Sequence, residues 1–370
     1  MIDTHGKKSR NLGIDLLRGL AMFFVIVWHL TGQGGLLAHT ESGSVKFWTL
    51  SAVQMLTICC VNLYGLTTGY LMCDKPFKLS RVVKLWATTV FWSVAVSCVL
   101  FVTMPATRTF EEIVSMFLPI LRGRYWFFTA YFVVMMLSPA LNLVIRSLTR
   151  GQYRLLLAAL FLIFGVIPVG SLGYDVLRIF TGHHFSWMIV LYILGAYLRR
   201  FPVGNGERTH RWLLGYFLFG AAHLLYKFAT AAVGLNGFAN LLLTYPSPLV
   251  VGESICLFLY FKEAFSGMPE KDTLDRLIRF AAPGVYSVYV IHVHPKVYWN
   301  TDIIALFRAW DNWNTAAVCA AMVVTSAALF TVCICLDAVR QRIFCSLGID
   351  RAIEKLSGQI ERKVRTLLGD

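Results

Sequence analysis

Charged side chains are scarce in this 370-residue sequence. Only 15% of its residues are Asp, Glu, Lys or Arg, compared with about 25% in typical soluble domains. This leaves too little polar surface to cover a soluble globule of the same length. A disordered chain, which needs abundant charge and few hydrophobic residues, is excluded for the same reason.

Cysteines are missing from the segments in which structural disulfides would be expected. All nine lie either in long apolar stretches or in segments predicted to face the cytoplasm. A secreted domain held together by disulfides is therefore excluded. Because no cysteine or histidine spacing is typical of a zinc site, we also expect no bound metal.

Hydrophobic residues, by contrast, make up 57% of the chain, and the mean hydropathy is +0.63. About 20 apolar residues cross a hydrocarbon core of about 30 Å, and such stretches recur throughout. The sequence predicts an all-α polytopic membrane protein with about ten transmembrane helices. The sixth stretch is short and Pro283 and Gly284 interrupt the ninth, so one of these two is a candidate for a broken or re-entrant segment. The ten predicted spans are 14–31, 48–72, 82–104, 125–145, 153–170, 185–199, 211–234, 245–262, 278–298 and 315–337.

The formal net charge is +14, and the basic residues responsible for it are distributed in step with the predicted spans. Basic residues cluster before the first span, at Lys7, Lys8 and Arg10, and in every second loop thereafter. This alternation predicts that both termini are cytoplasmic and that the protein lies in the cell membrane. No nucleic-acid partner is needed to explain the charge. The predicted outer segments contain only Lys46, Arg108, Arg122, Arg124, Arg178, Lys296 and Arg308.

The chain divides into a predicted membrane domain at 1–338 and a cytoplasmic tail at 339–370. Apolar residues recur in the tail at helical spacing among basic ones, which predicts an amphipathic helix that binds membrane lipids on the inner leaflet. These apolar residues are Ile349, Ile353, Leu356, Ile360, Val364 and Leu367.

Three ionisable residues occur within the first span: Asp15, Arg18 and His29. Arg18 and His29 are eleven positions apart, which at about 100° per residue is close to three full turns. All three side chains are therefore predicted to share one helix face, and ionisable residues inside a membrane indicate a functional site. The alternative is an Asp15–Arg18 pair at one membrane edge and an unrelated interfacial hydrogen bond of His29.

The segment from Arg10 to Ala21, followed by His29, resembles the opening signature of the acyltransferase 3 family, in which an arginine precedes a histidine by eleven positions. Many members carry adjacent basic residues at the entry to the third span, where this chain has Arg81 and Lys84. Further resemblances follow in the family's order, at Asn62–Tyr70, Arg81 with Lys84, Tyr125–Phe127 with Tyr131 and Pro139, and Ser287–His292.

The resemblance implies an integral membrane O-acyltransferase of the stand-alone branch that modifies surface glycans. It would move an acyl group, usually acetyl, from cytoplasmic acyl-CoA to a hydroxyl of an extracytoplasmic glycan or its lipid-linked precursor. His29 would be the base or a transient acyl carrier, since a neutral imidazole suits proton transfer near pH 7. Arg18, Arg81 and Lys84 would bind the CoA phosphates, and no metal is implied.

Other residues are assigned supporting roles. His292 ends the ninth span on the predicted outer side, where it could approach His29, although an interfacial hydrogen bond explains it equally well. Glu253 in the eighth span must face the helix bundle or a cavity. Trp126 and Tyr131 are expected on the acceptor side, although Trp126 also suits an interfacial aromatic belt. His183, in an outer loop, is expected to be solvated.

A transporter without covalent chemistry is the main alternative, because ten spans with Glu253, His223 and Lys227 inside them are compatible with transport. The absence of a recognisable repeat between the two halves counts against it. A role beside a partner sensor module is a weaker third hypothesis. The sequence leaves the acceptor sugar and the oligomeric state open.

Overall fold

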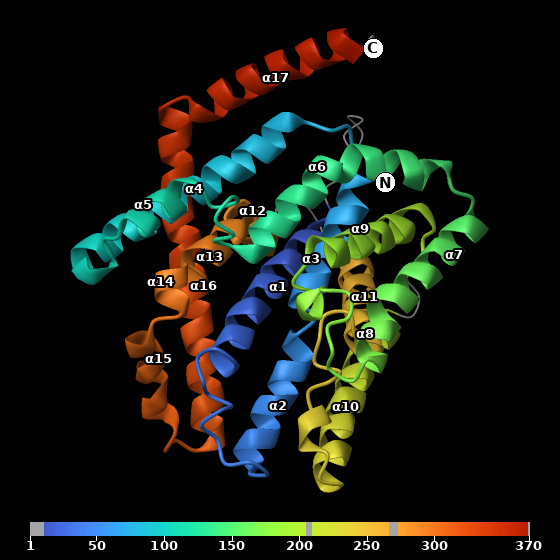
Figure 1. The fold of residues 1–370 in the computed structure, drawn as a ribbon, viewed down its shortest axis with the longest axis vertical. Helices are drawn as coiled ribbons and strands as arrows, with labels where there is room; N and C mark the ends of the chain where they lie inside the picture. Colours follow the sequence, from blue (N-terminus) through green and yellow to red (C-terminus); the bar gives the residue numbers. More distant parts are fainter. Residues whose placement is uncertain (1–10, 205–208, 266–272, 369–370) are drawn as a thin grey trace.

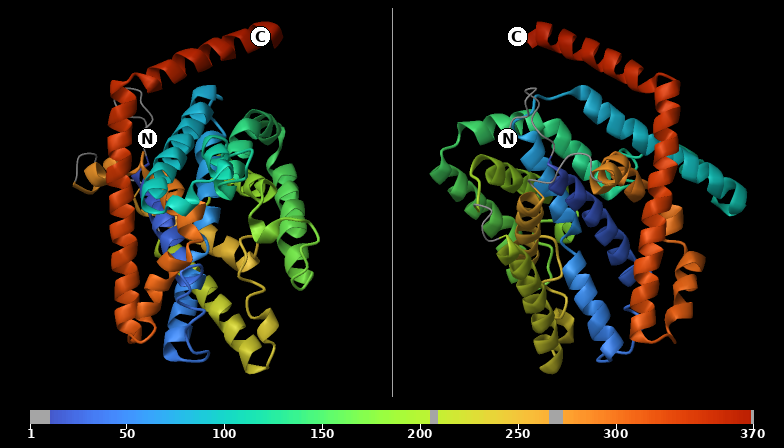
Figure 2. Two further views of the ribbon diagram at one scale, coloured as in Figure 1. Left: turned by 60° about the vertical axis from the view of Figure 1, so that its left-hand side comes forward. Right: turned by 180° about the vertical axis from the view of Figure 1, so that it is seen from behind.

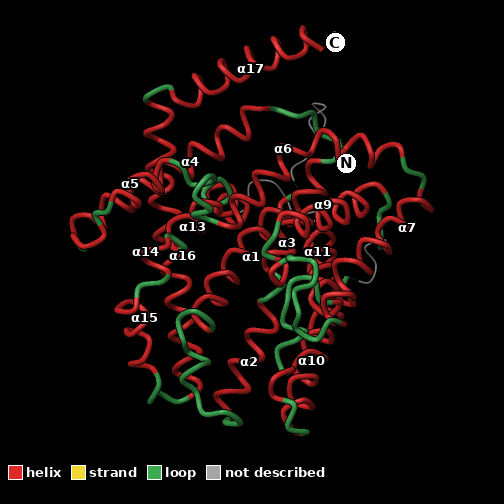
Figure 3. The backbone as a smooth tube through the Cα atoms, viewed as in Figure 1, coloured by secondary structure: helices red, strands yellow, loops and turns green. Residues whose placement is uncertain are grey.

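The computed structural model describes residues 11–204, 209–265 and 273–368, and every regular element in these ranges is a helix (Figures 1 and 3). The all-helical prediction is therefore confirmed for the described part of the chain. Lys7, Lys8 and Arg10, which support the predicted orientation of the N-terminus, lie outside the described residues.

Seven helical stretches of the described residues are long and apolar enough to cross a membrane. They coincide with seven of the ten predicted spans. Two of them are interrupted: α2 and α3 are separated at Ile58 and Cys59, and α7 and α8 are joined by a π-helical turn. The seven are α1 (Leu12–Thr31), α2 with α3 (Val45–Thr57, Cys60–Met72), α4 (Leu79–Thr103), α6 (Trp126–Ser147), α7 with α8 (Arg150–Phe161, Ile167–Gly170), α10 (His210–Ala232) and α16 (Thr315–Ser346).

The other three predicted spans contain shorter helices, so ten crossings remain a prediction. The sixth and eighth correspond to α9 (Phe185–Arg200) and α11 (Pro248–Ala264). At about 1.5 Å per residue these helices measure about 24–26 Å, slightly less than a 30 Å hydrocarbon core. The ninth is broken at Pro283 and Gly284 into α12 (Thr273–Ala281) and α13 (Val285–His292).

The centre of the bundle depends on a close contact between α3 and α9. A Cβ atom at Gly69 would overlap the carbonyl oxygen of Tyr192, and one at Gly195 would overlap the carbonyl oxygen of Leu66. Glycine lets two helix backbones approach to this distance. The short α9 is therefore fixed against α3 by backbone contact.

The short helix α14 (Pro295–Tyr298) forms the end of the predicted ninth span, whereas the short helices α5 (Phe110–Phe117) and α15 (Thr301–Phe307) lie outside the predicted spans. The tail forms α17 (Ile349–Leu368), which confirms the helix predicted there. Helix α16 continues to Ser346, so the predicted domain boundary at 338 falls inside it.

Helix α17 crosses one end of the helical body, next to the start of α4 (Figures 1 and 2). The Leu79 N–H donates to Glu361 at 2.5 Å, and the Lys84 ammonium donates to Glu354 at 2.8 Å. We call the end of the body that carries α17 the inner end, and the opposite end the outer end.

Candidate active site

Helices α1 and α13 bring two histidines together in the outer half of the body. His29 lies in the last turn of α1 and His292 is the last residue of α13. The Nδ1 atom of His29 lies 3.1 Å from the Nε2 atom of His292. The approach predicted for these histidines is therefore found in the structure.

The hydrogen bonds of this pair determine where its protons sit. The Nδ1 atom of His292 lies 2.5 Å from the Val288 carbonyl oxygen. A carbonyl only accepts, so this nitrogen carries a hydrogen, and in a neutral ring Nε2 then becomes the acceptor. His29 must therefore donate from Nδ1. Its Nε2 atom is left with a free lone pair, which is the form required of a general base.

Helix α13 has only eight residues, and side chains of the motif seen in the sequence hold it in place. The Tyr286 and Thr89 hydroxyls lie 2.6 Å apart, which ties α13 to α4. The Tyr289 hydroxyl accepts the Phe127 N–H at 3.3 Å, which ties it to the start of α6. His292 is thus oriented by contacts from several helices.

Asp337 on α16 provides the third attachment. Its carboxylate accepts hydrogen bonds from the Ser287 hydroxyl at 2.5 Å and the Trp92 indole at 2.9 Å. Arg340, one turn further along α16, forms an ion pair with the same carboxylate at 2.6 Å. Asp337 is fully buried, so this network joins α4, α13 and α16 in the bundle interior.

A cavity of about 70 Å³ lies beside His29. It extends inward to Tyr64, whose hydroxyl donates to the Arg18 carbonyl oxygen at 2.8 Å. The cavity therefore extends along α1 from His29 toward Arg18, which does not itself line it. Its lining is largely aromatic and comprises Met22, Val25, Trp28, His29, Cys60, Val61, Tyr64, Trp126, Phe127, His183, Tyr245, Tyr289 and Tyr298.

Aromatic residues close the outer side of the cavity. Trp126 lies 4.5 Å from the His183 ring and stacks on Tyr245 at 6.2 Å, measured between ring centroids. Tyr131 does not line the cavity, but it stacks on the lining residue Phe127 at 5.8 Å. Of the two residues predicted for the acceptor side, Trp126 thus borders the cavity directly and Tyr131 supports it.

The inner end of α1 lies among several cations. Arg18 is 3.9 Å from Asp15, one turn earlier on the same helix. Partial burial and the nearby Arg81 lower the pKa of Lys75, whose ammonium also interacts with Arg18 and Arg199. We refer to Arg18, Lys75, Arg81 and Arg199 as the inner cation cluster. Lys75 and Arg199 were not among the predicted residues.

Lys84 is placed differently from Arg81. Its ammonium lies 2.8 Å from Glu354 and 3.7 Å from Asp350, both on α17. Lys84 therefore attaches the tail helix to α4, and it can contact a donor only when these ion pairs open.

Glu253 lies on α11, away from the cavity beside His29. It is fully buried, and neither carboxyl oxygen has a hydrogen-bond partner in the described part of the chain. The same is true of both ring nitrogens of His223 on α10. Lys227, one turn further along α10, donates to Ser51 on α2 at 3.1 Å.

A comparison with protein families agrees with the resemblance seen in the sequence. The family model of the acyltransferase 3 domain matches residues 11–332. The chain belongs to this family. Together with the seven span-length helices, membership makes this protein a multi-pass membrane protein with an acyltransferase domain. No curated protein and no solved structure is significantly similar to the chain.

In this acyltransferase 3 domain, the matched region includes both histidines, the cavity and the inner cation cluster, and it ends before Asp337 and α17. The sequence prediction missed Tyr64, Tyr245 and Tyr298 of the cavity wall. Each occurs in an apolar segment where an aromatic residue is unremarkable, so only the fold shows that they converge. His183, expected in a solvated loop, is exposed but also lines the cavity.

A buried polar cluster close to the histidine pair was also missed. Arg124 donates to Glu112 at 2.5 Å and to Ser97 at 3.1 Å, and it also contacts His294. Burial alone would raise the pKa of the Glu112 carboxyl, but hydrogen bonds from Arg124 and Ser97 outweigh burial and lower it. Because His294 follows His292 by two residues, this cluster fixes the chain just beyond the histidine pair.

Proposed function

We propose that this protein is a membrane O-acyltransferase that moves an acetyl group from cytoplasmic acetyl-CoA to a hydroxyl of an extracytoplasmic glycan or its lipid-linked precursor. The observation that carries the proposal is the free Nε2 lone pair of His29 beside a cavity that leads inward to Tyr64, whose hydroxyl donates to the Arg18 carbonyl oxygen. A base, a donor-binding end and an acceptor-binding end then lie along one helix.

The donor would bind at the inner end. CoA is rich in phosphate, and guanidinium groups bind phosphate oxygens through paired hydrogen bonds. Arg18, Arg81, Lys75 and Arg199 supply the charge, and Asp15 holds Arg18 in place. The predicted role of Lys84 in donor binding then requires α17 to release it.

Transfer would proceed by direct attack of the acceptor hydroxyl on the thioester carbon. His29 Nε2 takes the hydroxyl proton while the new C–O bond forms, and the C–S bond then breaks. The leaving thiolate receives the proton from His29 as CoA thiol, so the base is regenerated. His292 Nε2 accepts from His29 Nδ1–H and stabilises the positive charge that His29 carries between these two proton transfers.

The small size of the cavity supports a short acyl group. At about 70 Å³ it has room for about two water molecules, each of which occupies about 30 Å³ in the liquid. An acetyl group is of this size, whereas a long acyl chain would require the aromatic wall to move.

The test is acetyl transfer to envelope glycans by purified protein in nanodiscs, followed by mass spectrometry. Replacing His29 with Ala should lower the transfer rate by about 10²–10⁴-fold, the usual contribution of a general base. His210→Ala is the matched control, because His210 is exposed at the start of α10. Undiminished acetylation by the His29→Ala variant would remove the proposed chemistry.

A second candidate function is solute transport. It is favoured by the buried Glu253 and His223, whose polar atoms have no partner among the described residues, as expected where a solute or ion completes the site. Solute flux through proteoliposomes without consumption of acetyl-CoA would favour this function over acyl transfer.

A further inference from the structure

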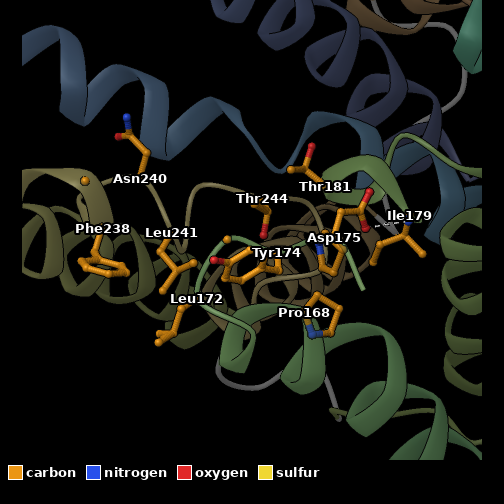
Figure 4. Close-up of a pocket in the computed structure, with 13 residues that line it drawn as sticks. Pro168, Leu172, Tyr174, Asp175, Ile179, Thr181, Phe238, Asn240, Leu241 and Thr244 are labelled. Carbon is orange, nitrogen blue, oxygen red and sulfur yellow. Dashed lines mark hydrogen bonds between the residues drawn. The ribbon is translucent and has the colours of Figure 1, made fainter. Parts of the chain in front are cut away.

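A second cavity has a volume of about 250 Å³. Figure 4 shows residues that line it. Its walls come mainly from two connections, 171–184 between α8 and α9 and 233–247 between α10 and α11. We propose that this cavity binds an uncharged sugar unit of the acceptor, adjacent to the unit that is acetylated. The inference rests on the proposed acyltransferase function and assigns a separate binding role to these two connections.

The two cavities share a wall. Thr181, which lines the larger cavity, accepts the Tyr245 N–H through its carbonyl oxygen at 3.2 Å. Its hydroxyl lies 3.0 Å from Nδ1 of His183. His183 and Tyr245 both line the cavity beside His29, whereas Pro246 lines the larger one. A glycan that places one hydroxyl near His29 would therefore reach the larger cavity with the neighbouring unit.

The lining of the larger cavity suits a neutral sugar. Tyr174 and Phe238 are exposed aromatic side chains, and aromatic faces pack on the apolar faces of sugar rings. Asn240 and Thr244 offer an amide and a hydroxyl, and a few placed polar groups of this kind orient a ligand. Asp175 is held in position by the Ile179 N–H, which donates to its carboxylate at 2.9 Å.

The charge of the lining and the volume of the larger cavity further restrict the class of ligand that it can bind. Among the described residues that line this cavity there is no lysine or arginine, so the lining offers no such cation to a pyrophosphate or to the carboxylate of an acidic sugar. The volume of about 250 Å³ has room for about eight water molecules at about 30 Å³ each. This is enough for one sugar ring and too little for a longer oligosaccharide.

The backbone of the first connection is strained in a way that fits a binding role. Leu172, Arg178 and Thr181 have φ angles of 53°, 53° and 57°, and within the described ranges no other non-glycine residue has a positive φ. Such φ angles are unfavourable for residues that carry a side chain, and residues of this kind cluster at ligand sites. Gly182, with φ 96°, packs so closely that a Cβ atom there would lie 2.8 Å from that of Tyr245.

The experiment measures acetyl transfer from acetyl-CoA by the protein in nanodiscs. Each monosaccharide acceptor is compared with a disaccharide that contains it. The probes are the methyl glycosides of glucose, galactose and N-acetylglucosamine and of disaccharides that contain them. The wild-type protein should show a KM for the preferred disaccharide about tenfold below that for its monosaccharide. Tyr174→Ala and Asn240→Ala should remove this difference while kcat stays within about threefold, as expected for lost ground-state binding.

Asn236→Ala is the matched control, because Asn236 and Asn240 are exposed residues of the same connection and only Asn240 lines the cavity. This variant should keep the preference for the disaccharide. Saturation-transfer NMR with the preferred methyl disaccharide should also show weaker contact in Tyr174→Ala than in Asn236→Ala.

A disaccharide preference that both cavity variants retain would overturn the assignment while leaving the acyltransferase proposal intact. A fall in kcat without any change in KM would also overturn it, because the residues would then affect chemistry rather than binding. Absence of transfer to every glycoside, with intact acetyl-CoA, would overturn the proposed function and this subsite together.

Discussion

Two buried polar regions of this protein differ in how their hydrogen bonds are satisfied. In the first, His29 and His292 have defined partners, and Asp337 accepts hydrogen bonds or ion pairs from Trp92, Ser287 and Arg340. In the second, Glu253 and His223 are fully buried with no hydrogen-bond partner among the described residues. Asp337 in the first region is as fully buried as Glu253 and His223 in the second, so burial alone does not distinguish the two regions.

The side chains of the first region are held in fixed orientations by hydrogen bonds, whereas those of the second region are buried without such bonds among the described residues. A chain of hydrogen bonds fixes which nitrogen of His29 is free, and a base must be oriented in this way before it can act. The carboxyl of Glu253, which has no hydrogen-bond partner among the described residues, has no such constraint. The comparison therefore supports the chemistry proposed for the first region and leaves the second as a cost in stability or a site that a solute completes.

The largest expected effect concerns the anchor of the first region. Asp337→Ala should destabilise the protein by about 3–5 kcal/mol, because Arg340 would remain buried without its partner. Thermal unfolding in detergent measures this effect. The control is Asp350→Ala, whose ion pair with Lys84 is exposed. If both variants unfolded at the same temperature as the wild type, Asp337 would not be an anchor.

Replacing His292 should have the next largest effect. This effect should be on the rate of acetyl transfer rather than on the stability of the protein. The His292→Ala variant loses the acceptor that fixes the His29 tautomer, and we expect kcat to fall by about 10²-fold. The KM for acetyl-CoA should stay unchanged, because the inner cation cluster is untouched. A glutamine in place of His292 can still accept a hydrogen bond and should restore part of the rate, which a purely structural role would not explain.

Glu253→Leu tests the second region directly. An unsatisfied buried polar group costs about 1–3 kcal/mol, so this variant should unfold at a higher temperature than the wild type. Acetyl transfer should be unaffected, since Glu253 does not line the cavity beside His29. Loss of acetyl transfer in a folded Glu253→Leu protein would show that the second region also takes part in the reaction and would contradict the distinction drawn between the two regions.

The smallest effect is expected at the exposed contact between α4 and α17. The Lys84 hydrogen bond and charge lower the pKa of Glu354. A carboxyl with a lowered pKa stabilises the folded state above its unfolded pKa, and this contribution is lost as the pH falls through the folded value. Protection of α17 from limited proteolysis should therefore decrease at acidic pH and in high salt. Lys84→Ala should remove this pH dependence while overall thermal stability changes little.

The sequence predicted much of the first region because local periodicity carries the information. Helical spacing placed Asp15, Arg18 and His29 on one face, and motif order placed His292 near the outer end. Hydropathy likewise located seven helices of sufficient length. It also placed the short α9 and α11 to within three residues, and Pro283 and Gly284 marked the break between α12 and α13. Hydropathy registers apolar composition, so it does not show whether these shorter segments cross the membrane.

Partners that are distant in the chain were beyond prediction. Asp337 meets Ser287 across fifty residues, and Lys84 meets Glu354 across 270. Neither pair has a signal in local spacing, because only the packing of α4, α13, α16 and α17 creates it. The larger cavity was missed for the same reason: its two connections have ordinary loop composition and become neighbours only in the folded chain.

The contact between α3 and α9 restricts how the sequence of this protein can vary. Every amino acid other than glycine would bring a carbon atom onto a carbonyl oxygen at Gly69 or Gly195. A saturation library should therefore recover a single residue at these two codons, while exposed positions such as Val99 and Val102 of α4 accept many. Acceptor preference can diversify through the outer connections only while this pair of codons stays unchanged.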